Sequence, residues 1–204
     1  MRTAPRFVTT ITVGAALLWF AMSTAAAAPP ESDPILEGAF QTAHAIPETQ
    51  RQVSAMVRLA NACAESGLRG LAERALEEAA ALASQCTKPE PLMRQVGSAY
   101  VRNGLYEQAH KVADSIGQKR LALRLLTEIA DAHLDSGDRQ KALEALGEVV
   151  GLLEKTEDAA VRVEHLAAAA RRYAKLGRRE PAASLLREAA GAAAGAQDSR
   201  VADG

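Results

Sequence analysis

The 204-residue chain contains few aromatic residues, and its charges nearly balance. Tryptophan, tyrosine and phenylalanine together make up 3% of the residues, and 24 basic side chains accompany 25 acidic ones. So few aromatic rings argue against a surface on which sugars or nucleic-acid bases could stack. The chain also lacks the excess of positive charge that is typical of proteins that bind nucleic acid or anionic lipid. The composition therefore predicts that nucleic acid is not a partner.

The sequence also lacks the spaced motifs on which most catalytic and metal sites depend. It contains no Gly-Xaa-Ser-Xaa-Gly motif, no glycine-rich phosphate loop and no pair of cysteines at zinc-binding spacing. The four histidines, none of which forms a metal-binding pair at helical spacing, are His44, His110, His133 and His165. His133 follows an apolar helical pattern, which indicates a core position. We expect a non-enzymatic protein without cofactor or metal; an enzyme whose site the sequence hides is the weakest alternative.

The two cysteines, Cys63 and Cys86, are not expected to form a disulfide. Cys63 lies near the end of one predicted helix, and Cys86 lies beyond the far end of the next, antiparallel helix. The rise of a helix places them on the order of 20 Å apart, whereas bridged Cα atoms lie within roughly 7 Å of each other. We expect a buried thiol at Cys63 and an exposed one at Cys86.

The N-terminal region has the parts of a secretory signal. Arg2 and Arg6 precede an uncharged stretch, residues 7–28, that ends in a run of small residues. Cleavage after Ala27 would place small side chains, Ala25 and Ala27, at the two positions that signal peptidase requires to be small. We expect residues 1–27 to be a signal peptide and residues 28–34 a linker, which predicts a periplasmic or secreted protein.

An uncleaved anchor is the alternative interpretation of the same segment, because about 20 apolar residues suffice to span a bilayer. Threonine and serine residues within the stretch weaken that interpretation. An uncleaved segment would hold the protein at the inner membrane.

One pattern recurs four times along the rest of the chain: a small residue, six residues, a glycine, four residues, then an alanine. The copies are Ala60, Gly67 and Ala72; Gly97, Gly104 and Ala109; Ala130, Gly137 and Ala142; and Ala170, Gly177 and Ala182. The glycines are 37, 33 and 40 residues apart, which is the period of a repeating helical pair. This spacing predicts an all-α solenoid.

Each glycine follows a run of apolar residues spaced three and four apart, so we expect it to end one helix and begin the turn to the next. The predicted hairpins are 50–66 with 69–84, 91–103 with 105–116, 119–136 with 139–154, and 158–176 with 179–194. Residues 35–67 align without a gap to residues 105–137, which adds a helix at 35–46 that caps the stack. The prediction is about nine helices in a repeat domain at 35–194, followed by a disordered tail at 195–204.

Two units carry the fuller form of the pattern, and they resemble tetratricopeptide (TPR) repeats. The matching residues are Gly97, Tyr100, Gly104, Tyr106 and Ala109 in one unit, and Ala170, Tyr173, Gly177 and Ala182 in the other. The resemblance covers residues 35–194 and suggests a divergent bacterial exported member of the TPR-like family. It implies an α-solenoid whose first helices line a concave groove for peptides of partner proteins.

The resemblance also implies which residues face that groove. They are Asn61, Glu65, Arg94, Ser98, Arg102, Asp131, Asp135, Arg171 and Lys175, together with the uncharged Val57, Thr127 and Ala167. A clamp for a C-terminal carboxylate is disfavoured, because Val57 stands where such a clamp needs a cation.

The charges of this predicted face alternate from acidic to basic along the four repeats. Two interpretations remain open. The groove matches a partner of alternating charge, or the charges form exposed ion pairs between repeats, each contributing about 0–1 kcal/mol.

Together these features predict a protein-protein interaction scaffold or adaptor exported to the cell envelope. A membrane-tethered structural component of an envelope complex is the alternative. The last predicted helix adds one question, because residues 182–194 contain only two charged side chains, Arg187 and Glu188. Such an end could stack on a second copy or on a partner, unless its alanines expose too little apolar area to matter.

Overall fold

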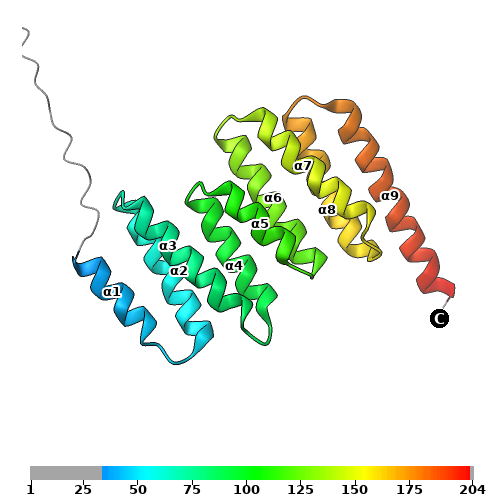
Figure 1. Ribbon diagram of the computed structural model, residues 1–204. Coiled ribbons are helices and arrows are strands. Elements are labelled where there is room, and N and C mark those ends of the chain that lie inside the picture. The colour runs from blue at the N-terminus through cyan, green and yellow to red at the C-terminus, as the bar shows by residue number, and fades with distance from the viewer. Residues whose placement is uncertain (1–33, 203–204) are drawn as a thin grey trace, which may run out of the picture.

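The computed structural model describes residues 34–202, with side chains described as far as residue 195, so the predicted signal peptide and nearly all of the linker lie outside the described residues. The described part is all-α and contains nine helices and no strand. They are α1 (Pro34–His44), α2 (Thr49–Glu65), α3 (Arg69–Ser84), α4 (Pro89–Arg102), α5 (Tyr106–Ser115), α6 (Lys119–Asp135), α7 (Arg139–Glu154), α8 (Ala159–Lys175) and α9 (Arg179–Ala202). Figure 1 shows them arranged in chain order along one axis. The chain is an α-solenoid of TPR-like repeats, as the glycine spacing predicts.

The four hairpin turns share one geometry. Gly67, Gly104, Gly137 and Gly177 have φ between 73° and 79°, a left-handed conformation that glycine adopts at little cost. The N–H of the residue after each glycine donates to the carbonyl five residues before it, at 2.8 to 2.9 Å, as Leu68 does to Cys63. This arrangement is the Schellman motif, which satisfies carbonyls that the helix end would leave unpaired. The recurring glycine is therefore the signal that stops the first helix of every hairpin.

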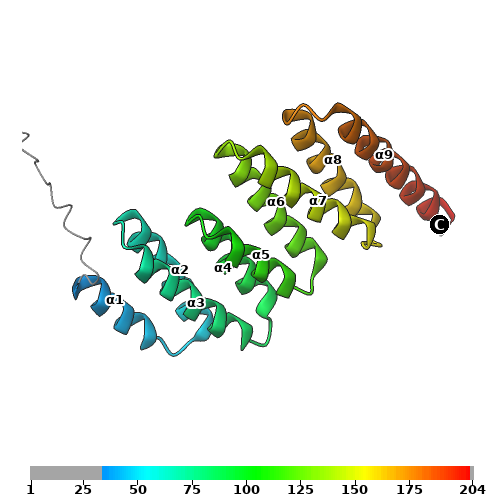
Figure 2. The ribbon, with the colours of Figure 1, turned by 45° about the horizontal axis from the view of Figure 1, so that its top comes forward.

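The two helices of a hairpin belong to two layers. We call the first helices, α2, α4, α6 and α8, the A helices, and the second helices, α3, α5, α7 and α9, the B helices. Each A helix packs directly against the A helix of the next repeat, and Figure 2 shows the hairpins stacked in this way. B helices instead meet through the tips of long side chains, as where Gln108 Nε2 donates to Glu73 Oε1 at 2.9 Å. The A layer is therefore the tighter, inner side of the stack.

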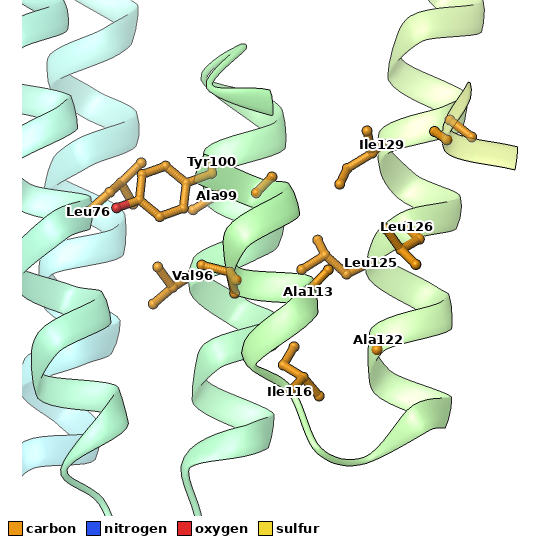
Figure 3. Close-up of a cluster of buried hydrophobic side chains, with 14 of the residues drawn as sticks. Leu76, Val96, Ala99, Tyr100, Ala113, Ile116, Ala122, Leu125, Leu126 and Ile129 are labelled. Carbon is orange, nitrogen blue, oxygen red and sulfur yellow. The ribbon is translucent and has the colours of Figure 1, made fainter. Parts of the chain in front are cut away.

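The core runs continuously from repeat to repeat. Figure 3 shows Val96 and Tyr100 of α4 pointing towards α3, where Leu76 lies, and Leu125 of α6 pointing back towards the α4–α5 hairpin. Burial is the main cause that raises the pKa of Tyr100 to about 12, with Glu77 and Glu73 adding to it. The alanines five residues after the turn glycines, Ala72, Ala109, Ala142 and Ala182, are at most 6% exposed. Small residues at these positions let the two helices of a hairpin approach closely.

Position 97 requires a glycine because of the next repeat as well as its own hairpin. A Cβ atom at this position would lie 2.3 Å from Leu125 Cδ2 of α6 and 3.1 Å from Val112 Cγ1 of α5. Leu125 is fully buried, so its side chain has little room to move. The glycine therefore allows α4 and α6 to pack closely between repeats.

The C-terminal helix is longer than the sequence predicts. Residues 195–202, expected to be disordered, continue α9 as far as Ala202. The alanine-rich residues 189–194 that precede this segment favour helix, and the segment itself contains no proline that would stop the helix. The prediction of disorder relied on the absence of apolar periodicity in this segment. Apolar periodicity indicates packing against other helices, and a helix can form without it.

The predictions for the two cysteines are confirmed in part. Cys63 is 1% exposed, and neither cysteine forms a disulfide, as predicted. Cys86, which was expected to be exposed, is half-buried in the α3–α4 connection, where its Sγ donates to the Leu82 carbonyl at 3.5 Å. The connection folds back onto α3 instead of extending into solvent, which accounts for the difference.

No helix within residues 34–202 combines the length and apolar character that crossing a membrane requires.

The crowding at Gly97 leads to a stability prediction. Gly97→Ala should lower the free energy of unfolding by about 1–3 kcal/mol, because the added methyl group overpacks a buried contact. The matched control is Gly147→Ala in the exposed interior of α7, where a Cβ meets nothing within 4 Å. That change should raise stability by about 0.5–1 kcal/mol, since alanine is the better helix former. Urea unfolding of both variants measures the two effects. Equal stability of the two variants would mean that Gly97 is not needed for packing.

Candidate functional site

The predicted inner-face residues divide into two groups in the structure. Asn61, Arg94, Ser98 and Asp131, in the middle of the A helices, bond to the following repeat. The side chains of the other five are exposed and make no hydrogen bond or ion pair with any described residue. Four of them stand two residues before the turn glycines, namely Glu65, Arg102, Asp135 and Lys175, and the fifth, Arg171, stands at the same repeat position as Asn61, Ser98 and Asp131. The uncharged Val57 is buried, and Thr127 and Ala167 are half-buried.

The centre of the first group is Glu128 of α6. Arg94 Nη1 lies 3.3 Å from Glu128 Oε1, and the buried Ser98 hydroxyl donates to Glu128 Oε2 at 2.5 Å. Arg94 also donates to the Ser98 hydroxyl at 3.3 Å. The three side chains join α4 to α6, so they hold two repeats together and have few groups left for a partner.

The same kind of contact recurs at the neighbouring repeat boundaries. Arg172 of α8 makes a two-pronged ion pair with Asp131 of α6, at 2.7 Å from Nε to Oδ1 and 2.5 Å from Nη2 to Oδ2. Asn103, which caps α4, donates to Asn61 of α2 at 3.2 Å. These contacts confirm ion pairs between repeats for part of the predicted face. The partners Glu128 and Arg172 differ from those that the alternating charges suggested.

Sequence reasoning missed Glu128, Asn103 and Arg172, although a signal for them exists. Each contact joins side chains 30 to 42 residues apart, which is close to one repeat. Pairing polar residues one period apart, at every position of the A helix and not only at positions typical of a groove, would have identified these side chains.

Four of the five members of the second group form a line across the stack. Glu65, Arg102, Asp135 and Lys175 each stand two residues before a turn glycine, one in each repeat, and we call them the turn-end row. Their charges alternate from acidic to basic, yet no ion pair joins any two of them. Exposed groups without partners retain their full capacity to bind oppositely charged groups of another molecule.

A shallow hollow of about 370 Å³ adjoins the row at Arg102. It lies between the turns of the first two hairpins and is lined by Arg69 and Glu73 of α3 and by Asn103. Its polar lining, and its place beside an unpaired guanidinium, fit a carboxylate-bearing side chain better than an apolar ligand.

The histidines have structural roles where they are buried. His133, predicted to be a core residue, is 4% exposed, and its ring centroid lies 4.3 Å from that of Tyr106. His165 is equally buried, and its Nε2 has no hydrogen-bond partner among the described residues. Burial lowers the pKa of both imidazoles. Within residues 34–202, no group of three or more histidine, cysteine, aspartate or glutamate residues is placed to hold a metal ion.

No protein-family model matches the chain, and neither does any curated protein. Among solved structures, the chain is similar to the crystal structure of nearly identical TPR-like repeats from a Podosopora anserina protein assigned as a kinesin light chain. The two chains share 23% sequence identity, and the match covers 80% of this chain and 86% of the other, with a TM-score of 0.44. The repeat architecture of the present chain is visible in its own turns and helix pairs.

The buried histidines predict a loss of stability in mild acid. Their folded-state pKa values lie below 6.5, so the unfolded chain takes up protons that the folded chain does not. Stability is therefore fully present above about pH 6.5 and falls below it, by at most about 1.4 kcal/mol per pH unit for each group.

Urea unfolding at about pH 7.5 and about pH 5.5 tests this, with His165→Gln and His133→Gln as comparisons. Carboxylates and other histidines titrate in all three proteins, so the informative quantity is the difference in pH dependence. Each variant should lose less stability on acidification than the unmodified chain. Parallel losses would show that the imidazoles take up protons in the folded state.

Proposed function

We propose that the protein is a non-enzymatic interaction scaffold, exported to the cell envelope, that binds a partner protein or peptide along the inner face of its repeats. The observation that carries this proposal is the turn-end row, because it gathers one unpaired charge from each repeat on a rigid support. Residues 1–28, with two arginines followed by an uncharged stretch, support export.

The spacing of the row suggests the form of the bound segment. Packed helices lie about 8–10 Å apart, and a peptide extended in the polyproline II conformation rises about 3.1 Å per residue with three residues per turn, so that every third side chain points to the same side. Every third residue of an extended segment would therefore meet the next repeat. A complementary partner carries basic and acidic side chains in alternation at these positions, so that each faces an opposite charge in the row.

A second candidate function follows from the same N-terminal sequence. The uncharged stretch is long enough to cross a bilayer if it is not cleaved, and the protein would then be a membrane-tethered assembly component. The intact mass of protein recovered from the envelope distinguishes the two, because retention of residues 1–27 excludes a released scaffold.

The row predicts that charge reversal weakens partner capture without unfolding the chain. The test variant combines Arg102→Glu, Asp135→Lys and Lys175→Glu, all at exposed sites without partners. The matched control combines Lys111→Glu and Glu107→Lys on α5 with Lys155→Glu at the end of α7, which changes the net charge by the same amount on the B layer. Crosslinking pulldown from envelope extracts measures capture, and thermal unfolding checks the fold.

Capture should fall at least about tenfold for the inner-face variant and remain unchanged for the control, since each lost charge pair at a partly desolvated contact contributes about 1 kcal/mol or more. Capture that survives all three reversals would show that the partner binds elsewhere.

A further inference from the structure

The C-terminal end of the stack exposes a surface that is buried in every other repeat. Leu186 of α9 stands nine residues after its turn glycine and is 52% exposed. The residues at the same position in the other B helices are Leu76, Ala113 and Leu146, and none of them is more than 3% exposed. They are covered because each B helix packs against the A helix of the following repeat.

The apolar surface continues along α9 at helical spacing. Ala190 is exposed and Ala193 is half-buried, four and seven residues after Leu186. In α3 the matching residues, Leu76, Ala80 and Ala83, have the same chemical character: one leucine followed by two alanines. α3 uses this face to receive α4, whose Val96 and Tyr100 point towards it (Figure 3).

A polar position repeats in the same way. The residue six before each turn glycine bonds to the next repeat in three of four cases: Asn61 with Asn103, Ser98 with Glu128, and Asp131 with Arg172. The fourth is Arg171 of α8, which is exposed and has no partner among the described residues. The end of the stack thus carries both the apolar and the polar half of a boundary between repeats.

The charge of this surface indicates what it would accept. Arg171 lies one turn from Lys175, and Arg187 of α9 is also exposed and unpaired. An A helix stacked here would place the counterpart of Asn103 or Glu128 close to Arg171, and an acidic side chain there would form an ion pair.

We propose that the α8–α9 end is a second docking surface, distinct from the turn-end row, which binds an acidic amphipathic helix of a partner protein in the manner of a further A helix. The helix would place its apolar stripe on Leu186, Ala190 and Ala193 and an acidic residue against Arg171. A second copy of the chain fits less well, because the opposite end of the stack is α1, a helix of the B type whose Glu37 is already paired with Arg74.

The test uses the full chain and a helical probe whose sequence is taken from α4. The probe is a fluorescent, side-chain-stapled peptide of residues 89–103 carrying Arg94→Gln, Arg102→Gln and Asn103→Glu, and the control probe carries Asn103→Lys in place of Asn103→Glu. Fluorescence anisotropy measures binding to the unmodified protein and to three variants: Leu186→Glu, Arg171→Glu, and Arg102→Glu combined with Asp135→Lys. All four sites are exposed, and circular dichroism verifies that each variant is folded.

The acidic probe should bind the unmodified chain at least about tenfold more tightly than the lysine probe. Leu186→Glu should abolish binding of both probes, and Arg171→Glu should reverse the preference so that the lysine probe binds more tightly. The variant with Arg102→Glu and Asp135→Lys should bind the acidic probe as tightly as the unmodified chain does. The experiment therefore tests the end surface separately from the turn-end row, and either proposal can fail without the other.

Three outcomes would overturn the proposal. Equal binding of the two probes would show that Arg171 does not contribute to recognition. Binding that persists in Leu186→Glu would show that the probe binds at another surface. Absence of binding at millimolar protein would mean that the end accepts no such helix. If sedimentation then shows dimers that Leu186→Glu dissociates, a second copy is the occupant.

Discussion

The structure depends on the packing of each A helix into the groove between the two helices of the preceding hairpin. A single hairpin has apolar residues on the face that meets the next repeat, as Leu76 shows, and only the following A helix removes them from water. The contact is close enough that α4 requires a glycine, Gly97, opposite Leu125. Stability in such a stack is approximately a sum of hairpin terms and nearest-neighbour boundary terms, so boundaries decide whether the fold persists.

This requirement determines which polar side chains remain available for binding. The middle of each A helix lies against its neighbour, so its polar groups are used across the boundary, as in the Arg172 and Asp131 pair. Two residues before the turn glycines the side chains are exposed, and no described residue pairs with Arg102 or Asp135. Binding capacity is therefore concentrated near the turns, because the stack itself occupies the rest of the inner face.

The sequence predicts the helices well because their ends are encoded locally. Each turn glycine supplies a conformation that other residues adopt only with strain, and the predicted ends of α3 and α7 coincide with the structure. Side-chain pairing between repeats is less predictable, since it depends on the offset between adjacent A helices. Glu128, for example, pairs with Arg94 and Ser98 because α6 is placed so that its ninth residue before the glycine faces them. The length of α9 was misjudged because a helix can continue past its last apolar contact, and residues 195–202 contain no proline that would stop it.

The two ends of the described stack are chemically different, and this gives the molecule a direction. At the α1 end, Phe40 packs inward beneath the Arg74 guanidinium, which lies 4.4 Å above its ring, and Glu37 and His44 bind polar groups of α3. Through these contacts α1 caps the stack, and its polar side chains are already paired with side chains of α3. At the α9 end, the face that receives an A helix in the other repeats is present without one, and Arg171 lacks the partner found at each earlier boundary. Because a solenoid grows by adding an A helix to the face of the last hairpin, recognition at this end needs no new type of site. It would reuse the contact that assembles the fold, with specificity coming from the one position whose charge differs from those of the internal boundaries.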